Sequence, residues 1–388
     1  MAFIPPITEQ RLMLEHIVRL AELSDVAADV ADSVLEGIGA FAAGEWAPLD
    51  RAGDLVGPKW TTQGVKMPVG YAEAYQAFVT GGWGSIGSPA DFGGQGLPLS
   101  LSAAVLETLG TANVGFGLAP ILTVGAIEAL IHHGTDAQRA AYLPRLSTGE
   151  WTGTMNLTEP QSGSDLNGLR TRAEPADDGQ WKIRGTKIFI SFGDHDLAKN
   201  IIHLVLAHTP GLPSGSRGLS LFLVPKYRLD QQGAPGEPND VRTVSIEHKL
   251  GLHASPTCVL SFGDEDNCLG ELIGAEGGGL RAMFTMMNNA RLNVALQGVQ
   301  VAERATQQAA SYACERIQGS RGGNKVAIIE HPDVRRMLLR MKAQTAAARA
   351  LAYFAFGQLD RARRRPGRPG PRRTDHAAGK GALHRHRQ

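Results

Sequence analysis

The hydrophobic periodicity of this 388-residue chain changes twice, and this pattern constrains its fold more than any other feature. Residues 8–150 have a mostly helical period, for example at Val26, Val30, Val34 and Ile38. Residues 151–267 form short β-rich runs separated by Gly and Pro. Long helical patterns return in residues 279–316 and 331–359. This order predicts an α+β fold in which a small barrel or sandwich separates two helical regions.

The same pattern predicts domain boundaries. We expect an N-terminal α-helical domain in residues 1–150, a β domain in 151–275 and a C-terminal helical domain in 276–360. With two long helices, the last domain would form only part of a helical bundle. Residues 361–388 contain ten Lys and Arg residues, one acidic residue and no periodicity, so they are expected to be a disordered basic tail.

Composition places the chain among ordinary soluble globular proteins, with 43% hydrophobic and 20% charged residues. The N-terminus carries no signal-peptide pattern, and no window approaches the roughly 18 apolar residues of a membrane helix, so a cytoplasmic protein is expected. The three cysteines, Cys258, Cys268 and Cys314, form no CxxC pair. They are expected to be buried thiols, and no metal site is expected.

Two short segments carry the candidate chemistry. In residues 155–165, Pro160 and Gly163 favour a tight turn whose successive amides can face an anion, and Ser164 adds a hydroxyl. In residues 181–191, Phe189 and Ser191 lie two apart, on one face of a predicted strand. Amides, hydroxyls and one aromatic face suit a flat, polar, phosphate-bearing ligand such as a flavin. The alternatives are a β-turn with capping hydroxyls and ordinary strand packing.

The two segments resemble the flavin-binding signature of the acyl-CoA dehydrogenase family, and the resemblance covers residues 1–360. Further matching segments are residues 93–98, 150–154, 249–251 and 289–292. The family resemblance, closest to a long bacterial branch, implies FAD as cofactor, an acyl-CoA as substrate and an electron-transfer flavoprotein as electron acceptor. It also implies a homo-oligomer if the bundle is complete, with a neighbouring subunit contributing to the FAD site. Neither a membrane nor a nucleic acid is an expected partner.

The resemblance implies roles for individual residues. It places FAD contacts at Met155, Leu157, Thr158, Gly163, Ser164, Phe189, Ile190, Ser191, Arg316, Gln318 and His331. It places substrate contacts at Ser164, Asn288 and Arg291. Phe189 stands where the family usually has Trp, and Ser191 where it usually has the Thr that bonds to flavin N5. A salt bridge along the helix surface remains an alternative role for Arg291, and a helix cap for His331.

No residue matches either position of the family's catalytic Glu. Ala290 stands before Arg291, where a minority of members carry it, and no Glu follows Asp360. The base is therefore expected in a missing C-terminal segment, and the residues after about 363 resemble a frameshifted reading of a longer dehydrogenase. The expected function is FAD-dependent oxidation of an acyl-CoA thioester to the trans-2-enoyl-CoA. The alternatives are an inactive flavin- and acyl-CoA-binding remnant, or a flavin oxidase or monooxygenase of the same fold.

Overall fold

A computed structural model describes residues 3–23 and 26–364, and these residues form two compact units. Unit 1 contains residues 3–50, 97–114 and 292–364, and unit 2 contains residues 51–96 and 115–291. The order of a helical region, a β region and a second helical region confirms the predicted fold class. The expected domain boundaries near residues 150 and 275 remain a proposal.

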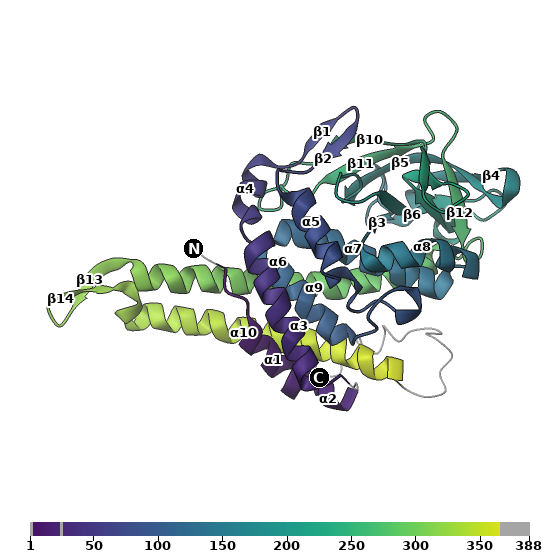
Figure 1. Cartoon of the computed structure of the whole chain (residues 1–388). Helices are drawn as coiled ribbons and strands as arrows, with labels where there is room; N and C mark the ends of the chain where they lie inside the picture. The colour runs from purple at the N-terminus through teal and green to yellow at the C-terminus, as the bar shows by residue number, and fades with distance from the viewer. Residues whose placement is uncertain (1–2, 24–25, 365–388) are drawn as a thin grey trace. The chain divides into compact units, whose positions relative to one another are not determined.

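Unit 1 consists of helices and one hairpin. Its elements are α1 (Ile7–Leu12), α2 (Leu20–Leu23), α3 (Ala28–Phe41), the start of α4 (Leu49–Val56), α6 (Leu99–Ala112), most of α9 (Gly279–Glu315), α10 (Pro332–Arg364), β13 (Ile317–Arg321) and β14 (Asn324–Ala327). Figure 1 shows α9 and α10 side by side, with the β13–β14 hairpin joining their ends. Helix α10 continues to Arg364, into the expected tail, whose remaining residues lie outside the described part of the chain.

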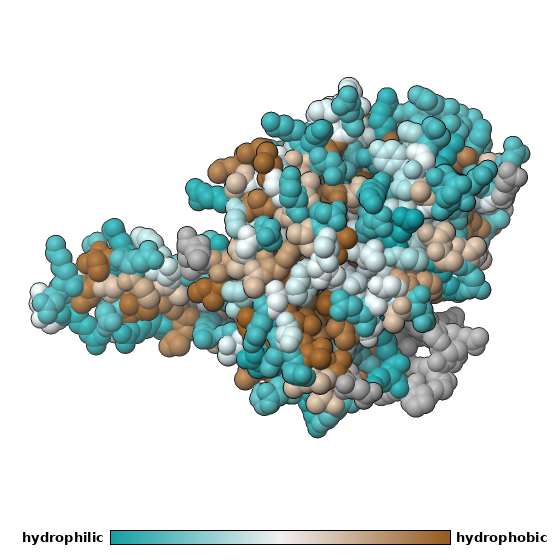
Figure 2. All heavy atoms as spheres, in the orientation of Figure 1, coloured by the Kyte–Doolittle hydropathy of each residue, from teal (hydrophilic) through white to brown (hydrophobic). Residues whose placement is uncertain are grey.

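Large apolar side chains are exposed along α9, α10 and their hairpin. Figure 2 shows brown patches among hydrophilic side chains on the molecular face that it presents. The exposed apolar side chains are Val294, Val301, Tyr312, Ile317, Met337, Leu339, Leu351 and Phe354. A continuous run of such residues is typical of helices that pack against further helices. The sequence also led us to expect a buried thiol at Cys314, and this was wrong, because the residue lies on an exposed face of α9.

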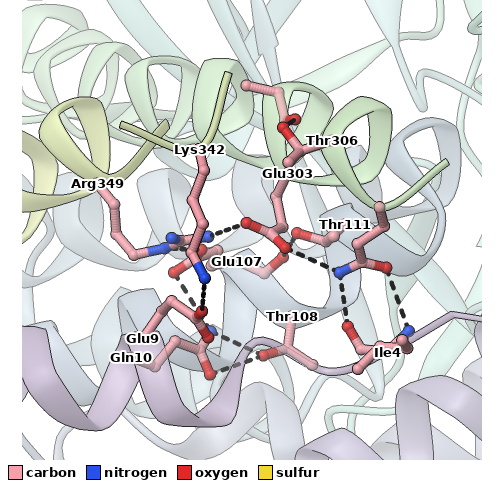
Figure 3. A network of polar contacts seen from close by, with 12 residues as sticks. Ile4, Glu9, Gln10, Glu107, Thr108, Thr111, Glu303, Thr306, Lys342 and Arg349 are labelled. Carbon is pink, nitrogen blue, oxygen red and sulfur yellow. Dashed lines mark hydrogen bonds and ion pairs between the residues drawn. The ribbon is translucent and has the colours of Figure 1, made fainter. Parts of the chain in front are cut away.

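A buried ion-pair network joins four helices of unit 1 (Figure 3). Arg349 on α10 is 1% exposed, and its Nε donates to Glu107 Oε1 on α6 at 2.7 Å while its Nη2 donates to Glu303 Oε2 on α9 at 2.8 Å. The Tyr353 hydroxyl and the Gln10 amide of α1 also donate to Glu107. Burial lowers the pKa of Arg349, but the two carboxylates outweigh burial and raise it, so the guanidinium stays charged.

Unit 2 contains a closed barrel. Its strands are β3 (Trp151–Asn156), β4 (Arg172–Pro175), β5 (Trp181–Ser191), β6 (Asn200–His208), β7 (Leu219–Pro225), β10 (Val241–Ile246), β11 (Thr257–Phe262) and β12 (Leu269–Ile273). The ladder β5–β12–β7–β6 closes through β4, which pairs antiparallel with β5 and parallel with β6. Strand β3 extends the sheet beside β6, and β11 and β10 extend it from β5. The predicted β domain is therefore a barrel with added strands.

Other elements of unit 2 lie before and after the barrel in sequence, and the hairpin of β8 (Tyr227–Leu229) and β9 (Pro235–Pro238) lies between β7 and β10. Those before and after the barrel are most of α4, β1 (Lys59–Thr61), β2 (Gly64–Lys66), α5 (Tyr71–Thr80), α7 (Val114–His133), α8 (Asp136–Thr148) and the first turns of α9. The β1–β2 hairpin interrupts the region that was expected to be mostly helical.

Strand β6 separates two apolar cores because its side chains alternate. Ile202, Leu204 and Leu206 pack with α7, α8 and the first turns of α9, whereas Val205 and Ala207 pack among the strands. Helix α7 contradicts the expectation that no segment is apolar enough to span a membrane, because an 18-residue window of it reaches a mean hydropathy of 1.9. That window is 72% buried, as in the core helix of a globular protein.

Two histidines of unit 2 are buried among polar partners. His195 Nδ1 accepts a hydrogen bond from the Leu197 amide, and its Nε2 lies 3.1 Å from Thr152 Oγ1. His203 Nδ1 lies 2.7 Å from Thr154 Oγ1. Burial lowers the pKa of each to about 3, with the Lys226 ammonium adding to the effect. Both imidazoles are therefore neutral at physiological pH.

Candidate functional site

The segment after β3 forms the tight turn that its residue types predict. The backbones of Glu159 and Ser162 exchange two hydrogen bonds, of 2.9 and 3.0 Å, around Pro160 and Gln161. The Ser162 hydroxyl donates to the carbonyl of Asp165, and the carboxylate of Asp165 accepts from the Asn167 amide at 2.9 Å. The turn is thus fixed by its own side chains.

A buried ion pair joins this turn to the second segment. Lys187 on β5 is fully buried, and its Nζ donates to Glu159 Oε1 at 2.8 Å and to the Leu157 carbonyl at 3.0 Å. Glu159 also accepts from the Thr171 hydroxyl at 2.5 Å and from the Arg170 amide at 2.7 Å. Lys187 lies two residues before Phe189. The Lys187–Glu159 pair therefore holds the end of β5 close to the turn, and these are the two predicted parts of the site.

The ionisation of the pair follows from its surroundings. Burial raises the pKa of Glu159, but the Lys187 ammonium and the donated hydrogen bonds outweigh it and lower the pKa to about 2. Burial lowers the pKa of Lys187 to about 8, against the opposing effect of Glu159. At neutral pH the pair is charged, so the turn is held by an ion pair that water does not reach.

Phe189 has an unusual backbone conformation. Its φ of +60° lies in the left-handed region, which is strained for a side chain of this size. The register of β5 against β11 shifts here, because Cys258 faces Ile190 while Leu260 faces Lys187. The bulge lets Lys187 and Ile190 both be buried, and it leaves the ring of Phe189 58% exposed. Phe189 and Ser191 flank the buried Ile190, but the bulge interrupts the regular alternation from which a shared strand face was predicted.

Several hydrogen-bond donors around the turn are unused. Within the described residues, the Gly163 and Ser164 amides and the hydroxyls of Thr158, Ser164 and Ser191 make no hydrogen bond. Gly163 and Ser164 are exposed, whereas Thr158 and Ser191 are partly buried. The Ile188 amide donates to the Thr158 carbonyl at 2.9 Å, which holds the end of β5 against the turn. The result is a surface with free amides, free hydroxyls and one exposed aromatic ring, which fits a flavin nucleotide.

Three predicted contacts have buried side chains. Leu157 and Ile190 belong to the two cores of unit 2, and Met155 is partly buried against the first of them. Their backbone groups, rather than their side chains, are therefore the groups that can face a ligand.

Helix α9 carries the predicted substrate residues. Arg291 is exposed, and its Nη1 donates to Asn288 Oδ1 at 3.0 Å while its guanidinium lies 5.7 Å from the centre of the Phe284 ring. Among the residues that the structure describes, Arg291 makes no ion pair. The alternative of a salt bridge along the helix surface is therefore not observed, and the guanidinium is available to an anionic or carbonyl group.

The three remaining predicted FAD contacts lie together in unit 1. Arg316 Nη2 lies 3.4 Å from Gln318 Oε1, and His331 Nε2 lies 2.8 Å from the Gln318 carbonyl. The Ile328 amide donates to the Arg316 carbonyl, so these residues meet where the β13–β14 hairpin joins its two helices. His331 precedes Pro332, the first residue of α10; its side chain bonds to the hairpin, while its backbone carbonyl accepts from the Arg335 amide of α10.

Sequence reasoning assigned no role to the residues that hold the site in place. Glu159, Lys187 and Thr171 form its buried anchor. Gly185 allows β5 to approach Thr171, because a Cβ on it would lie 2.4 Å from the Thr171 hydroxyl. Both segments contain further charged and polar residues, so nothing in the sequence singled out Glu159 and Lys187 as a pair. Nothing in the sequence pointed to Thr171.

Comparison with known proteins supports one family. Acyl-CoA dehydrogenase N-terminal, middle and C-terminal domain models match residues 32–150, 154–264 and 277–378. The 3-methylmercaptopropionyl-CoA dehydrogenase of Ruegeria pomeroyi is 49% identical over 376 residues, covering 94% of this chain and 63% of the relative. This relative confirms the branch that the sequence suggested.

Two further matches agree. A butyryl-CoA dehydrogenase of Syntrophomonas wolfei is 39% identical over 326 residues, covering 81% of this chain and 53% of the relative. The structure of an acyl-CoA dehydrogenase from Bacillus anthracis, complexed with FAD, matches with a TM-score of 0.71 and 25% identity, covering 87% of this chain and 52% of that one. The chain spans between about half and 63% of these proteins. It belongs to the acyl-CoA dehydrogenases, a family of FAD-dependent flavoprotein oxidoreductases.

Proposed function

We propose that this chain binds FAD where the turn after β3 meets the end of β5, and that it takes part in the oxidation of an acyl-CoA thioester to a trans-2-enoyl-CoA. The supporting observation is the exposed Phe189 ring, held at φ +60° beside a turn with unused amides and hydroxyls. Aromatic side chains and backbone donors of this kind fit the ring and the phosphates of a flavin nucleotide. When bound, the flavin supplies hydride acceptance, which no side chain can provide.

The residues of the turn and of β5 would position the cofactor. In this proposal the Gly163 and Ser164 amides bind phosphate oxygens, and the hydroxyls of Thr158 and Ser191 bind the polar edge of the flavin ring. Met155, Leu157 and Ile190 contribute backbone groups, because their side chains pack in the cores. The cluster of Arg316, Gln318 and His331 binds the cofactor of a neighbouring subunit in a homo-oligomer.

The substrate would lie beside α9 in the same proposal. Arg291 and Asn288 would bind polar groups of the acyl-CoA, and Ser164 would serve both ligands. Ala290, directly before Arg291, offers no carboxylate for proton abstraction at the position that carries the base in some relatives. We therefore propose that the base comes from outside the described residues, and that an electron-transfer flavoprotein accepts the electrons.

Flavin titration tests the cofactor site. FAD fluorescence should be quenched on binding to the purified chain, and Phe189→Ala should weaken binding about tenfold through the lost ring contact. Trp60→Ala is the matched control, because Trp60 is also an exposed aromatic residue of unit 2 but lies on β1. Equal affinities of Phe189→Ala and the unchanged chain would contradict the site.

Activity distinguishes the alternatives. With butyryl-CoA and a dye acceptor, bleaching of bound flavin indicates a working dehydrogenase, and bound flavin without bleaching indicates the inactive remnant. Oxygen consumption without dye reduction indicates an oxidase or monooxygenase. If only the base is absent, Ala290→Glu should restore bleaching, whereas Ala290→Gln should not, because a neutral amide cannot accept the proton.

A further inference from the structure

Two arginines face each other across strands β4 and β5. Arg172 and Arg184 are register partners in this antiparallel pair, and both are exposed. Like charges directly opposite each other destabilise a sheet, so the arrangement costs stability unless an anion lies between them. Two positions further along the ladder, Glu174 lies opposite Lys182, and these two residues have opposite charges. Repulsion is therefore confined to one end of the β4–β5 ladder.

These arginines line a groove of about 440 Å³ in unit 2. Its lining residues are Arg170, Arg172, Glu174, Lys182, Arg184, Gly185 and Asp266. Lys182 is already paired, because its Nζ lies 2.9 Å from Asp266 Oδ2. Within the described residues, the guanidiniums of Arg170, Arg172 and Arg184 form no ion pair. The groove thus holds three positive charges that lack a bonded carboxylate.

The composition of the groove selects the class of ligand. The planar fork of each arginine matches the oxygens of a phosphoryl group. Among the described residues, no aromatic side chain lines the groove to stack a base, and no large apolar side chain there offers an anchor for a protein partner. Figure 2 shows mainly hydrophilic side chains around this end of unit 2. With Lys182 the arginines give the groove four positive charges, against the two carboxylates of Glu174 and Asp266, so a positive charge remains for a compact anion with two phosphoryl groups.

We propose that Arg170, Arg172 and Arg184 form a binding site for a diphosphate group. These three side chains are not among the residues assigned to the proposed flavin site, although the groove adjoins its Glu159 anchor through Arg170. Arg170 contributes its amide to Glu159, while its side chain lines the groove. The diphosphate would come either from a free inorganic ion or from a nucleotide whose base stays in solvent. The site does not depend on whether the chain oxidises an acyl-CoA.

Calorimetric titration with sodium pyrophosphate tests the proposal on the full chain at low ionic strength. We expect one site, binding that weakens with added salt, and affinity at least about tenfold lower in the double variant Arg172→Gln/Arg184→Gln. Arg242→Gln is the matched control, because Arg242 is an exposed strand arginine that is paired with Asp264 at 2.5 Å. Absence of binding, or equal affinity in the double variant, overturns the site. Displacement of pyrophosphate by ADP supports a nucleotide source, and lack of displacement supports the free ion.

Thermal unfolding provides a second readout that does not depend on calorimetric heat. In low salt and without ligand, Arg184→Gln should melt at a higher temperature than the unchanged chain, because it removes the cross-strand repulsion. Pyrophosphate should raise the melting temperature of the unchanged chain and of Arg242→Gln, but not that of the double variant. A lower melting temperature for Arg184→Gln, or equal pyrophosphate stabilisation of all variants, contradicts the proposal.

Discussion

In the described part of each unit, one fully buried cation bonds to glutamate, but the two ion pairs join different parts of the structure. In unit 1, Arg349 bonds to Glu107 and Glu303 and thereby joins helices that are far apart in the sequence. In unit 2, Lys187 bonds to Glu159 and to the neighbouring Leu157 carbonyl, and so fixes one turn against one strand.

The difference lies in what would move if each pair were lost. Loss of the Arg349 ion pairs would loosen the packing of whole helices, because the bonded residues lie on α6, α9 and α10. Loss of the Lys187 ion pair would release a turn whose amides face solvent, while the barrel keeps its apolar cores. The buried ion pair thus stabilises the helix packing in unit 1, whereas in unit 2 it positions the turn whose amides are candidates for ligand binding. The following predictions test this contrast.

The largest expected effect comes from Arg349→Ala. It leaves the buried carboxylate of Glu107 and the partly buried carboxylate of Glu303 without their cation, so the free energy of unfolding should fall by about 5 kcal/mol, the upper end for a broken buried pair. Denaturant unfolding measures the loss. FAD affinity, measured where the variant is still folded, should change less than in Lys187→Met. Arg336→Ala removes an exposed cation of the same helix and should cost about 0.5 kcal/mol or less. Equal losses for both variants would contradict the buried network.

Acid should destabilise unit 2 through its buried histidines. The folded pKa of His195 and of His203 is lowered to about 3, so the unfolded chain binds more protons and stability falls as the pH drops below the unfolded pKa of about 6.5. From about pH 7 to about pH 5 the two residues together should cost about 4 kcal/mol. The free energy of unfolding, measured across this pH range, should depend on pH about half as strongly in His203→Gln. His16→Gln, which removes an exposed histidine of unit 1, should keep the full pH dependence.

Lys187→Met should cost about 3 kcal/mol, the lower end for a broken buried pair, because Glu159 keeps its hydrogen bonds to Thr171 and Arg170. FAD affinity should also fall by about tenfold or more, since the turn loses its attachment to β5. The control is Lys182→Met on the same strand, where the lysine is partly exposed and paired with Asp266. If Lys187→Met lost stability but kept full FAD affinity, the two ion pairs would have the same role.

The smallest effect is expected for Gly185→Ala. The added Cβ would lie 2.4 Å from the Thr171 hydroxyl at a backbone φ of +155°, so we expect a loss of about 2 kcal/mol from crowding and backbone strain. Gly179→Ala separates these causes, because Gly179 also has a positive φ but has open space around it. Equal losses in the two variants would show that contact with Thr171 contributes nothing.

The sequence predicted the fold well where one local pattern repeats. The long helical periods gave α9 almost to the residue and α10 at its start, although α10 runs five residues further than expected, to Arg364. The short β-rich runs between Gly and Pro gave strands such as β6. Pro160 predicted the turn because it acts locally, whereas Gly163 lies just after the turn that the backbone forms. The ring of strands was not predictable in detail, since its closure through β4 depends on pairing between residues distant in the chain.

The anchors of the candidate site were missed for the same reason. Thr171 reaches Glu159 only after β4 and β5 have paired, and Arg349 meets Glu107 across 242 positions of sequence. The exposure of Cys314 depends on which face of α9 is covered, which helical period alone does not fix. The assigned ligand roles of Thr158, Ser164, Phe189, Ser191 and the other site residues remain predictions.

The barrel of unit 2 closes through a narrow join. Within the described residues, β4 meets β6 through one pair, Arg172 opposite His208, next to a 2.8 Å hydrogen bond from the His208 amide to the Thr171 carbonyl. Amide hydrogen exchange is fastest where few bonds must break, so this join is where the barrel should open during native-state fluctuations. Each opening would draw Thr171 away from Glu159. The exchange rate at this join would then limit how long a molecule held by the adjoining turn stays bound, without any change in the rest of the fold.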